Sequence, residues 1–453
     1  MTKDLTVGSP MKLILGFTIP TLFGMLFQQF YNLVDTMIVG KLLGAQALAA
    51  VGSTGSINFL VIGFCMGVCN GFAIPVAQRM GANDPSKMRR YVANAAYLSM
   101  LFAVVLTAAT GLLCRHILVG MRTPEDIFQG AYAYIFVIFM GIPTTFLYNI
   151  VAGIIRSLGD SKTPVYFLAM SSFLNILLDF TLILWFHAGV AGAAIATVTS
   201  QGVSGLACLI YMKKKYPILH MSPEERRLDA HSCKVLCMMG IPMGLQYSIT
   251  AVGSIILQTA VNTLGSLYVT AVAAGSKLTQ LIACPYDAMG ATMATYCGQN
   301  VGACKLNRLG KGIRACTLLG LIYAGIALVA MIFFAPACTM LFLDPKEENL
   351  QQLIELTRYY VMVSTAFFFA LALVNIVRFS IQGMGYSVFA ICAGVLEMAA
   401  RTVVGLYMVP WLGYHAACFA SPAAWVCADL FLVPASALCI ARLKRMYPGF
   451  SKS

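Results

Sequence analysis

The sequence contains few charged residues. Asp, Glu, Lys and Arg make up only 10% of its 453 residues, against roughly 25% in soluble domains. Hydrophobic residues make up 59% of the chain, which excludes an ordinary soluble domain. A membrane span needs about 20 apolar residues to cross a hydrocarbon core of ~30 Å. Twelve such spans are predicted, at 13–40, 47–74, 91–117, 130–155, 164–186, 189–212, 234–263, 267–297, 312–342, 357–382, 387–410 and 415–441.

The sequence also lacks patterns for metal or nucleotide binding. Its five His form no ligand pattern, and neither Cys65/Cys69 nor Cys233/Cys237 has the neighbours that a zinc site needs. A GxxxxGK[ST] loop is absent, which excludes ATP hydrolysis by that route. We therefore expect no cofactor, no resident metal and no enzymatic activity.

The positions of the basic residues indicate orientation. The net charge is +13, and 22 of the 30 Lys and Arg lie at the termini or at the even-numbered loops between predicted spans. Cytoplasmic loops of membrane proteins carry such an excess of positive charge. We therefore expect a multi-pass protein of the lipid bilayer, with both termini in the cytoplasm and no nucleic-acid partner.

The second half of the chain repeats the first. Ile19-Pro20 returns as Ile241-Pro242, and Leu43-Gly44 returns as Leu264-Gly265, so the two copies keep one register to within a single position. Each half has six spans, so both copies enter the membrane in one orientation. This predicts two six-helix lobes related by a pseudo-two-fold axis along the membrane normal, as in many transporters. The predicted parts are an N-lobe, a solvated cytoplasmic linker and a C-lobe, at 1–212, 213–233 and 234–453.

Ionisable residues inside spans are costly and usually functional. The first half has two acids in its spans, Asp35 and Asp179, and no base. Glu397 precedes Arg401 by four residues in the second half, the favourable order for a helical ion pair, so we interpret this pair as mainly structural. The other ionisable residues of the second half can neutralise one another across helices, and Asp429 is a candidate for a second ionisable site. They are Asp287, Lys277, Arg378 and Asp429.

The two acids of the first half must take up a proton, share one or bind a cation, because they have no basic partner. Asp35 lies about 8 Å and Asp179 about 10 Å from the outer ends of their spans, and Thr197 lies at a depth of about 12 Å. These depths predict one oxygen-rich site for H⁺ or Na⁺. A purely structural pair of protonated Asp and a site for substrate alone are the alternatives. The polar residues on the same helical faces are Gln28, Asn32, Ser171 and Asn175.

These residues belong to an ordered set of motifs that covers nearly the whole chain. The set comprises Ile19-Pro20, Asn32-Leu-Val-Asp35-Thr, Gly-Lys-Leu-Leu-Gly-Ala, Gln78-x-x-Gly81, Arg156-Ser-Leu-Gly-Asp-Ser-Lys-Thr-Pro164, Asn175-x-x-x-Asp179 and Gln382-Gly-Met-Gly385. Single motifs are weak signals, but the ordered set is specific. The chain resembles the multidrug and toxic compound extrusion (MATE) family, in its prokaryotic branch.

The resemblance implies two lobes around a central cavity that opens alternately to either side of a bacterial cell membrane. It implies export of bulky, often cationic, amphipathic compounds against H⁺ or Na⁺, by a protein that we expect to work as a monomer. It assigns the coupling site to Asp35, Asn175, Asp179 and Thr197. Gln28, Asn32 and Ser171 are then polar residues of the cavity. The aromatic candidates for its lining are Phe27, Phe30, Tyr31, Phe139, Phe146 and Tyr247.

A related function is the main alternative. Lipid-linked oligosaccharide flippases belong to the same wider group and hold pyrophosphate in a cationic cavity. Twelve spans and an acidic first half argue against this reading, whereas Lys277, Arg378 and Arg401 favour it. Both functions predict the same fold, so the charges inside the spans decide between them.

Overall fold

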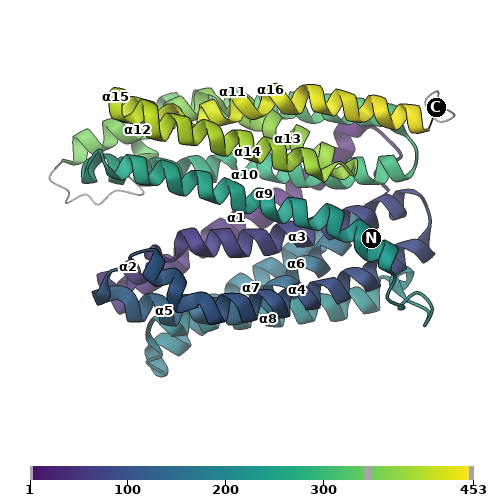
Figure 1. The fold of residues 1–453 in the computed structure, drawn as a ribbon, viewed down its shortest axis with the longest axis horizontal. Coiled ribbons are helices and arrows are strands. Elements are labelled where there is room, and N and C mark those ends of the chain that lie inside the picture. Colours follow the sequence, from purple (N-terminus) through teal and green to yellow (C-terminus); the bar gives the residue numbers. More distant parts are fainter. Residues whose placement is uncertain (1–3, 341–348, 448–453) are drawn as a thin grey trace. The chain divides into compact units, whose positions relative to one another are not determined.

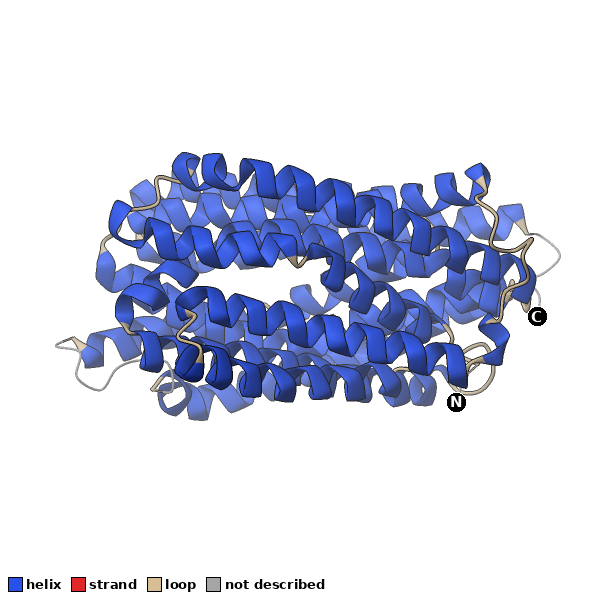
Figure 2. Ribbon diagram, turned by 90° about the horizontal axis from the view of Figure 1, so that it is seen from below, coloured by secondary structure: helices blue, strands red, loops and turns tan. Residues whose placement is uncertain are grey.

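The computed structural model describes residues 4–340 and 349–447. Every regular element in these residues is helical, as Figure 2 shows. Ten of the described helices are long and apolar enough to cross a membrane, and two bent pairs raise the number to twelve. The all-α class is therefore confirmed, and the twelve predicted spans agree with the upper number. The end of the predicted span 312–342 and the loop residue Lys346 lie outside the described residues.

The helices, which Figure 1 labels along the chain, form two compact units by their internal contacts. Both α1 (Pro10–Leu43) and α9 (Ala230–Asn262) contribute residues to each unit. Unit 1 is formed mainly by Phe23–Ser248, and unit 2 by Leu5–Leu22 together with the chain from Ile249 onward. The other helices of unit 1 are α2 (Ala45–Ser53), α3 (Gly55–Gly81), α4 (Pro85–Gly120), α5 (Glu125–Met140), α6 (Ile142–Ser157), α7 (Lys162–Phe180), the π-turn η1 (Thr181–Trp185), α8 (Gly189–Lys215) and the 3-10 turn η2 (Pro217–Leu219). Those of unit 2 are α10 (Ser266–Gly302), α11 (Leu306–Thr339), α12 (Leu350–Ala366), α13 (Phe368–Gly383), α14 (Ser387–Val403), the π-turn η3 (Val404–Met408), α15 (Val409–Leu412) and α16 (Tyr414–Met446).

This division differs from the predicted lobes 1–212 and 234–453 at two places. Residues 5–22 pack in unit 2, and residues 234–248 pack in unit 1. The sequence repeat marks where each copy begins along the chain, but packing decides where the first helix of each copy is buried. The predicted second span also begins later than expected, because 47–53 form the separate helix α2 and the spanning helix α3 begins at Gly55.

Residues just before α1 are fastened to unit 2 by hydrogen bonds. The backbone N–H of Leu5 donates to Oε1 of Gln299 at 2.9 Å, and Nδ2 of Asn300 donates to the carbonyl of Leu5 at 3.2 Å. Lys305 donates to the carbonyl of Thr6 at 3.0 Å, and Arg308 donates to that of Gly8 at 2.8 Å. Leu5 is only 1% exposed. This segment is thus packed and hydrogen-bonded within unit 2.

Most residues of the predicted linker 213–233 are exposed, as expected for a solvated segment, but Glu225 and Asp229 in its central part bind α4 within unit 1. Arg89 donates from Nε and Nη2 to the two carboxylate oxygens of Glu225, at 2.8 and 2.7 Å. The side chain of Asn94 accepts from the backbone N–H of Asp229 at 2.9 Å. Glu225 is 6% exposed and Asn94 is fully buried. The bidentate contact between Arg89 and Glu225 is the strong form of an ion pair.

Several irregular features recur at equivalent places in the two halves. The span formed by α5 and α6 bends by 45° at Gly141, and the span formed by α12 and α13 bends by 50° at Phe367, its counterpart in the second copy. Gly44 and Gly265 both have positive φ, of 86° and 106°, a conformation that glycine adopts without strain. Trp185 and Trp411, which share the offset of the two bends, are 80% and 90% exposed at the ends of η1 and α15. Such exposed Trp residues are typical of a membrane interface.

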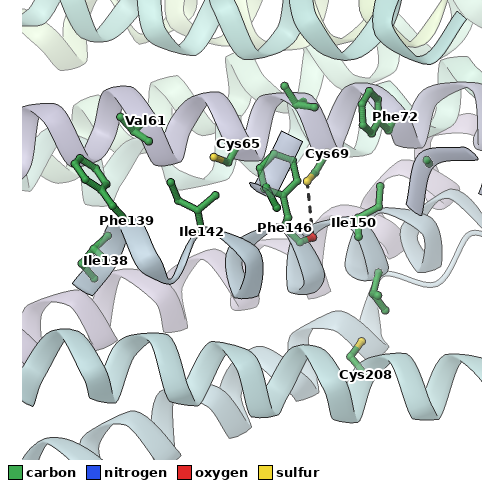
Figure 3. Close-up of a cluster of buried hydrophobic side chains, with 14 of the residues drawn as sticks. Val61, Cys65, Cys69, Phe72, Ile138, Phe139, Ile142, Phe146, Ile150 and Cys208 are labelled. Carbon is green, nitrogen blue, oxygen red and sulfur yellow. Dashed lines mark hydrogen bonds between the residues drawn. The ribbon is translucent and has the colours of Figure 1, made fainter. Parts of the chain in front are cut away.

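The hydrophobic core of unit 1 is built mainly by α3, α4, α5, α6 and α8, and Figure 3 shows part of it. Phe139 and Phe146 are 0% and 2% exposed in this core, beside Cys65, Cys69 and Phe72. The thiol of Cys69 lies 3.9 Å from the carbonyl oxygen of Phe146. Side chains packed so completely cannot line an open cavity, so the predicted lining role of Phe139 and Phe146 is corrected to core packing.

Small residues let α3 approach the first part of α9 within unit 1. A Cβ atom added at Gly71 would lie 2.5 Å from Cα of Gly240, and one added at Gly67 would lie 2.6 Å from the carbonyl oxygen of Met243. Gly240 and Gly244 in turn receive the rings of Phe72 and Phe64. Close backbone approach through small residues four apart is a common packing mode of membrane helices.

We expect Gly71→Ala to destabilise unit 1 by about 1–3 kcal/mol, because the new methyl group would meet backbone that cannot move aside. Gly325→Ala on α11 is the matched control, since an added Cβ there meets nothing within 4 Å. Thermal unfolding of the purified protein checks both variants. Equal melting temperatures for the two would contradict the close packing of α3 against α9.

Contact with Arg89 and the backbone N–H of Ser222 lowers the pKa of Glu225 to about 2. Because a depressed carboxyl pKa stabilises the fold only above the unfolded value, we expect Glu225→Gln to lower the melting temperature at neutral pH. The deficit should shrink as the pH falls below the ordinary Glu value of 4.5 and vanish near pH 2. Glu224→Gln, at an exposed neighbour, should show no such pH-dependent deficit. Melting curves over this pH range provide the measurement.

Candidate functional site

The structure brings Asp35 of α1 and Asp179 of α7 together inside unit 1. Their carboxyl groups interact directly with each other. Asp179 is fully buried and Asp35 is 9% exposed. Both carboxyl oxygens of Asp179 and one of Asp35 are shielded from solvent and have no hydrogen-bond donor among the described residues. Asp179 also lies just before the π-turn η1, and such turns are frequent at functional sites.

A hydroxyl group on α8 connects the helices around this pair. Oγ1 of Thr197 accepts a hydrogen bond from Nδ2 of Asn175 at 3.3 Å and lies 3.0 Å from the hydroxyl of Tyr31. Thr197 itself donates to the carbonyl of Ala193 at 3.1 Å. Asn175 is fully buried, and its Oδ1 atom has no donor among the described residues. The amide therefore presents an unused oxygen on the helix that carries Asp179.

The polar groups of the cluster offer oxygen atoms that can accept a proton or bind a cation. The cluster contains two buried carboxyl groups, the oxygen of a buried amide and the hydroxyl of the half-buried Thr197. Two adjacent carboxylates cannot both stay charged in such a place without a proton or a cation between them. The same oxygens also suit a hard monovalent cation. No group of three His, Cys, Asp or Glu side chains in the described parts of the chain is placed to hold a metal ion.

The other predicted polar residues lie around the cluster without joining it. Ser171 is 6% exposed, one turn before Asn175 on α7. Gln28 is half-buried and Asn32 is exposed, and no hydrogen bond between described residues links either side chain to the acids. Among the aromatic candidates, Tyr31 joins the cluster through Thr197.

The remaining aromatic candidates divide by exposure. Phe27 and Phe30 on α1 are 46% and 59% exposed. Tyr247 is half-buried on α9, where it lies against Gly63 of α3. These three keep the exposed or half-exposed surface that a lining residue needs, unlike Phe139 and Phe146. Their predicted role stays a prediction.

The sequence does not predict the positions of two polar residues of unit 1. Tyr134 of α5 is 8% exposed and interacts electrostatically with both Asp35 and Asp179. Arg156, expected in a loop, lies in the last turn of α6, where Nη2 donates to Oδ1 of Asn70 at 3.2 Å. The helices of the first half therefore do contain a half-buried base. Nothing in the spacing of Tyr134 distinguishes it from core aromatics, whereas a later end for span 4 would have included Arg156.

All ionisable candidates of the second half except Lys277 interact with one another inside unit 2. Glu397 contacts Arg401 at 3.7 Å, as the spacing predicted, and forms a closer ion pair with Arg378 of α13. Asp287 accepts a hydrogen bond from Nδ2 of Asn375 at 3.2 Å. Asp429 is half-buried on α16. Lys277 is exposed and lies ten residues before Asp287 on α10, about 15 Å along the helix.

The fold and these buried ionisable groups define a polytopic helical membrane protein with a duplicated architecture. A family model described as MatE matches residues 20–181 and 242–408, once in each half. The chain therefore belongs to the MatE family of multidrug transporters, which confirms the resemblance seen in the motifs.

Relatives and solved structures agree with this assignment. The chain is 31% identical over 299 residues to the "Probable multidrug resistance protein YpnP" of Bacillus subtilis, covering 66% of this chain and 67% of the relative. It is 22% identical to the "FAD transporter" of Shewanella oneidensis over 88% of both chains. The fold matches the crystal structure of "MATE in complex with MaL6" with a TM-score of 0.90, at 22% identity, over 98% of this chain and 100% of the other. An outward-facing MATE multidrug transporter matches with a TM-score of 0.89, at 21% identity, over 97% and 98% of the two chains.

We expect Asp179→Asn to stabilise the protein by about 1–3 kcal/mol at mildly alkaline pH, because the amide can donate to Oδ1 of Asp35, which has no donor among the described residues. Asp126→Asn removes an exposed carboxyl on α5 and serves as the control, with an expected change within about 0.5 kcal/mol. Thermal unfolding of the purified protein without added substrate is the measurement. A lower melting temperature for Asp179→Asn would show that the carboxyl pair has a stabilising partner.

Proposed function

We propose that the protein is a secondary active exporter of bulky amphipathic cations, driven by the inward movement of H⁺ or Na⁺. The observation that carries this proposal is the buried pair of Asp35 and Asp179, of which Asp179 is fully shielded and lacks a donor among the described residues. Family membership supports the transport of small molecules across a membrane. We further propose that it acts as a monomer in a bacterial cell membrane with both termini in the cytoplasm.

The coupling follows from charge. When the carboxyl pair is ionised, unit 1 attracts a cation, and a compound with positive charge is held nearby. When H⁺ or Na⁺ occupies the pair, the local negative charge falls and the attraction for the compound weakens. Exchange of one cation for the other is then antiport, because the two compete for the same charge.

The position of the cluster supports an effect of ion binding on α1. Asp35 and Tyr31 lie on this helix, and Tyr31 contacts Thr197 of α8. A change of charge at Asp35 directly changes the electrostatic interaction between α1 and Asp179 of α7. Pro20, in the same helix, removes one backbone hydrogen bond, so α1 is easier to bend near that residue. We therefore propose that α1 moves when the carboxyl pair changes its occupant.

Oxygen ligands do not separate the two candidate ions. Asp35, Asp179, the Oδ1 atom of Asn175 and the hydroxyl of Thr197 supply acceptors that suit Na⁺, and a carboxyl pair equally suits a shared proton. Transport measured under separate pH and Na⁺ gradients therefore has to identify the coupling ion.

The flippase alternative receives less support from the charges of unit 2. A site for pyrophosphate needs guanidinium groups that are available to the ligand. Arg378 and Arg401 both contact Glu397, and they are 5% and 6% exposed. Only Lys277 of the three bases is exposed. The exporter reading is therefore the one that we propose.

Efflux of a fluorescent cationic dye from cells or inside-out vesicles tests this function. We expect Asp35→Asn and Asp179→Asn each to lower ion-driven efflux by about tenfold or more, which corresponds to losing one charge-assisted interaction. A pH gradient and a Na⁺ gradient are imposed separately, and the gradient that drives the unmodified protein identifies the ion.

Asp126→Asn, at an exposed position on α5, is the matched control and should transport normally. Normal efflux by both site variants would assign Asp35 and Asp179 a structural role. Failure of the unmodified protein to move any dye, under either gradient, would favour lipid-linked substrates.

A further inference from the structure

A second polar network lies within unit 2, built by side chains from four helices. Arg378 of α13 is at its centre, because it pairs with Glu397 of α14 and interacts electrostatically with Asp287 of α10 and Asp429 of α16. Arg401, one turn after Glu397, approaches the second oxygen of that carboxylate at 3.7 Å. Asn375, one turn before Arg378, donates to Asp287 at 3.2 Å.

The centre of this network is closed to solvent. Glu397, Arg378 and Arg401 are only 3%, 5% and 6% exposed. One carboxylate therefore lies between two guanidinium groups, which leaves one positive charge without compensation in a buried place. Buried ion pairs are tolerated only when such a charge is balanced. Asp287 and Asp429 are the two groups that can balance it.

Balancing the charge requires only one of these two carboxylates. The network holds three acids and two arginines, so full ionisation would leave a net charge of −1. The sequence count had balanced the second half with Lys277, but this residue is exposed and about 15 Å away along α10. One carboxyl of the network therefore has no counter-charge and favours a bound proton.

The two carboxyl groups that compete for Arg378 differ in their access to water. Asp287 is exposed, and an exposed carboxyl in a membrane helix must face water, since hydrocarbon would not solvate it. Asp429 is half-buried, and its Oδ1 atom is shielded and has no hydrogen-bond partner among the described residues. Nη1 of Arg401 likewise lacks an acceptor in the described chain. The network is thus incompletely satisfied at two points.

Among the described residues, the helices around the network carry one further acid, Glu355 of α12, which is exposed. Tyr360 of α12 interacts with Arg401, and its hydroxyl accepts a hydrogen bond from Ser276 at 3.1 Å. Tyr323 of α11 donates to the carbonyl of Ile282 at 2.8 Å. The part of α9 in unit 2 has no ionisable side chain between residues 249 and 262. Two guanidinium groups would repel a metal cation, so the ligand that fits is a proton.

We propose that the Arg378-centred network of unit 2 is a second proton-exchange site, in which Asp287 and Asp429 together hold one exchangeable proton. Asp287 admits the proton from water, and Arg378 turns its charge toward whichever carboxyl is ionised. Its contribution to transport, as a second proton per cycle, rests on the antiport proposed above. Proton binding itself does not depend on that proposal.

Infrared difference spectroscopy between mildly alkaline and mildly acidic pH tests the site, because a protonated carboxyl has its own carbonyl band. The full-length protein is used with Asp35→Asn and Asp179→Asn, so that the carboxyl pair of unit 1 is silent. We expect one carboxyl band in this background and its loss on adding either Asp287→Asn or Asp429→Asn. Arg378→Gln should enlarge the band about twofold, since one base is then left for three acids.

Control variants distinguish the loss of a protonated carboxyl group from the unfolding of the protein. Glu224→Gln should leave the band unchanged, and Asp429→Glu should keep the band at a shifted frequency. Asp287 is exposed, so Asp287→Asn decides the question if Asp429→Asn does not fold. Absence of a band in the background, or its survival in a folded Asp287→Asn variant, overturns the proposal. A band in this background, together with no dye efflux by the unmodified protein, would support this site while contradicting the exporter function.

Discussion

Burial among apolar helices constrains the buried polar groups of this chain. Backbone groups are satisfied inside helices, so only side chains remain to be balanced. In unit 1 two carboxyl groups meet with no donor for Asp179 among the described residues, and in unit 2 three acids surround two arginines. Neither arrangement is neutral when all its groups are ionised. The chemistry that we assign to the protein follows from that imbalance, because a bound proton or cation is the simplest way to remove it.

Hydropathy and repetition were sufficient to predict most of the fold. Long apolar runs separated by basic loops predicted the helices and their number, and the internal repeat accounts for the equivalent bends at Gly141 and Phe367. What could not be predicted is the sharing of α1 and α9 between the two units. An apolar helix can be buried against many surfaces, and the Gly-to-backbone contacts that select one of them have no signature in hydropathy.

The depth of each residue in its predicted span, and the helical face on which it lies, predict part of the candidate site. Asp35, Asn175, Asp179 and Thr197 were grouped because they lie at similar distances from the ends of their spans. Tyr134 was missed because a buried aromatic residue in an apolar helix has no distinguishing pattern. In unit 2, spacing along one helix identified Glu397 and Arg401, but the closer pair between Glu397 and Arg378 joins two helices. Spacing along the sequence does not predict contacts between residues on different helices.

The hydrogen bonds around Leu5 bear on the order in which the molecule is made. The partners of Leu5, Gln299 and Asn300, are synthesised 294 and 295 positions after it. At about 5–20 residues per second, translation of that interval takes tens of seconds. During this time α1 is inserted while its first turns lack their final neighbours. The segment around Leu5 therefore reaches its final packing only after α10 has been made, and any factor that protects this segment must act for that whole period.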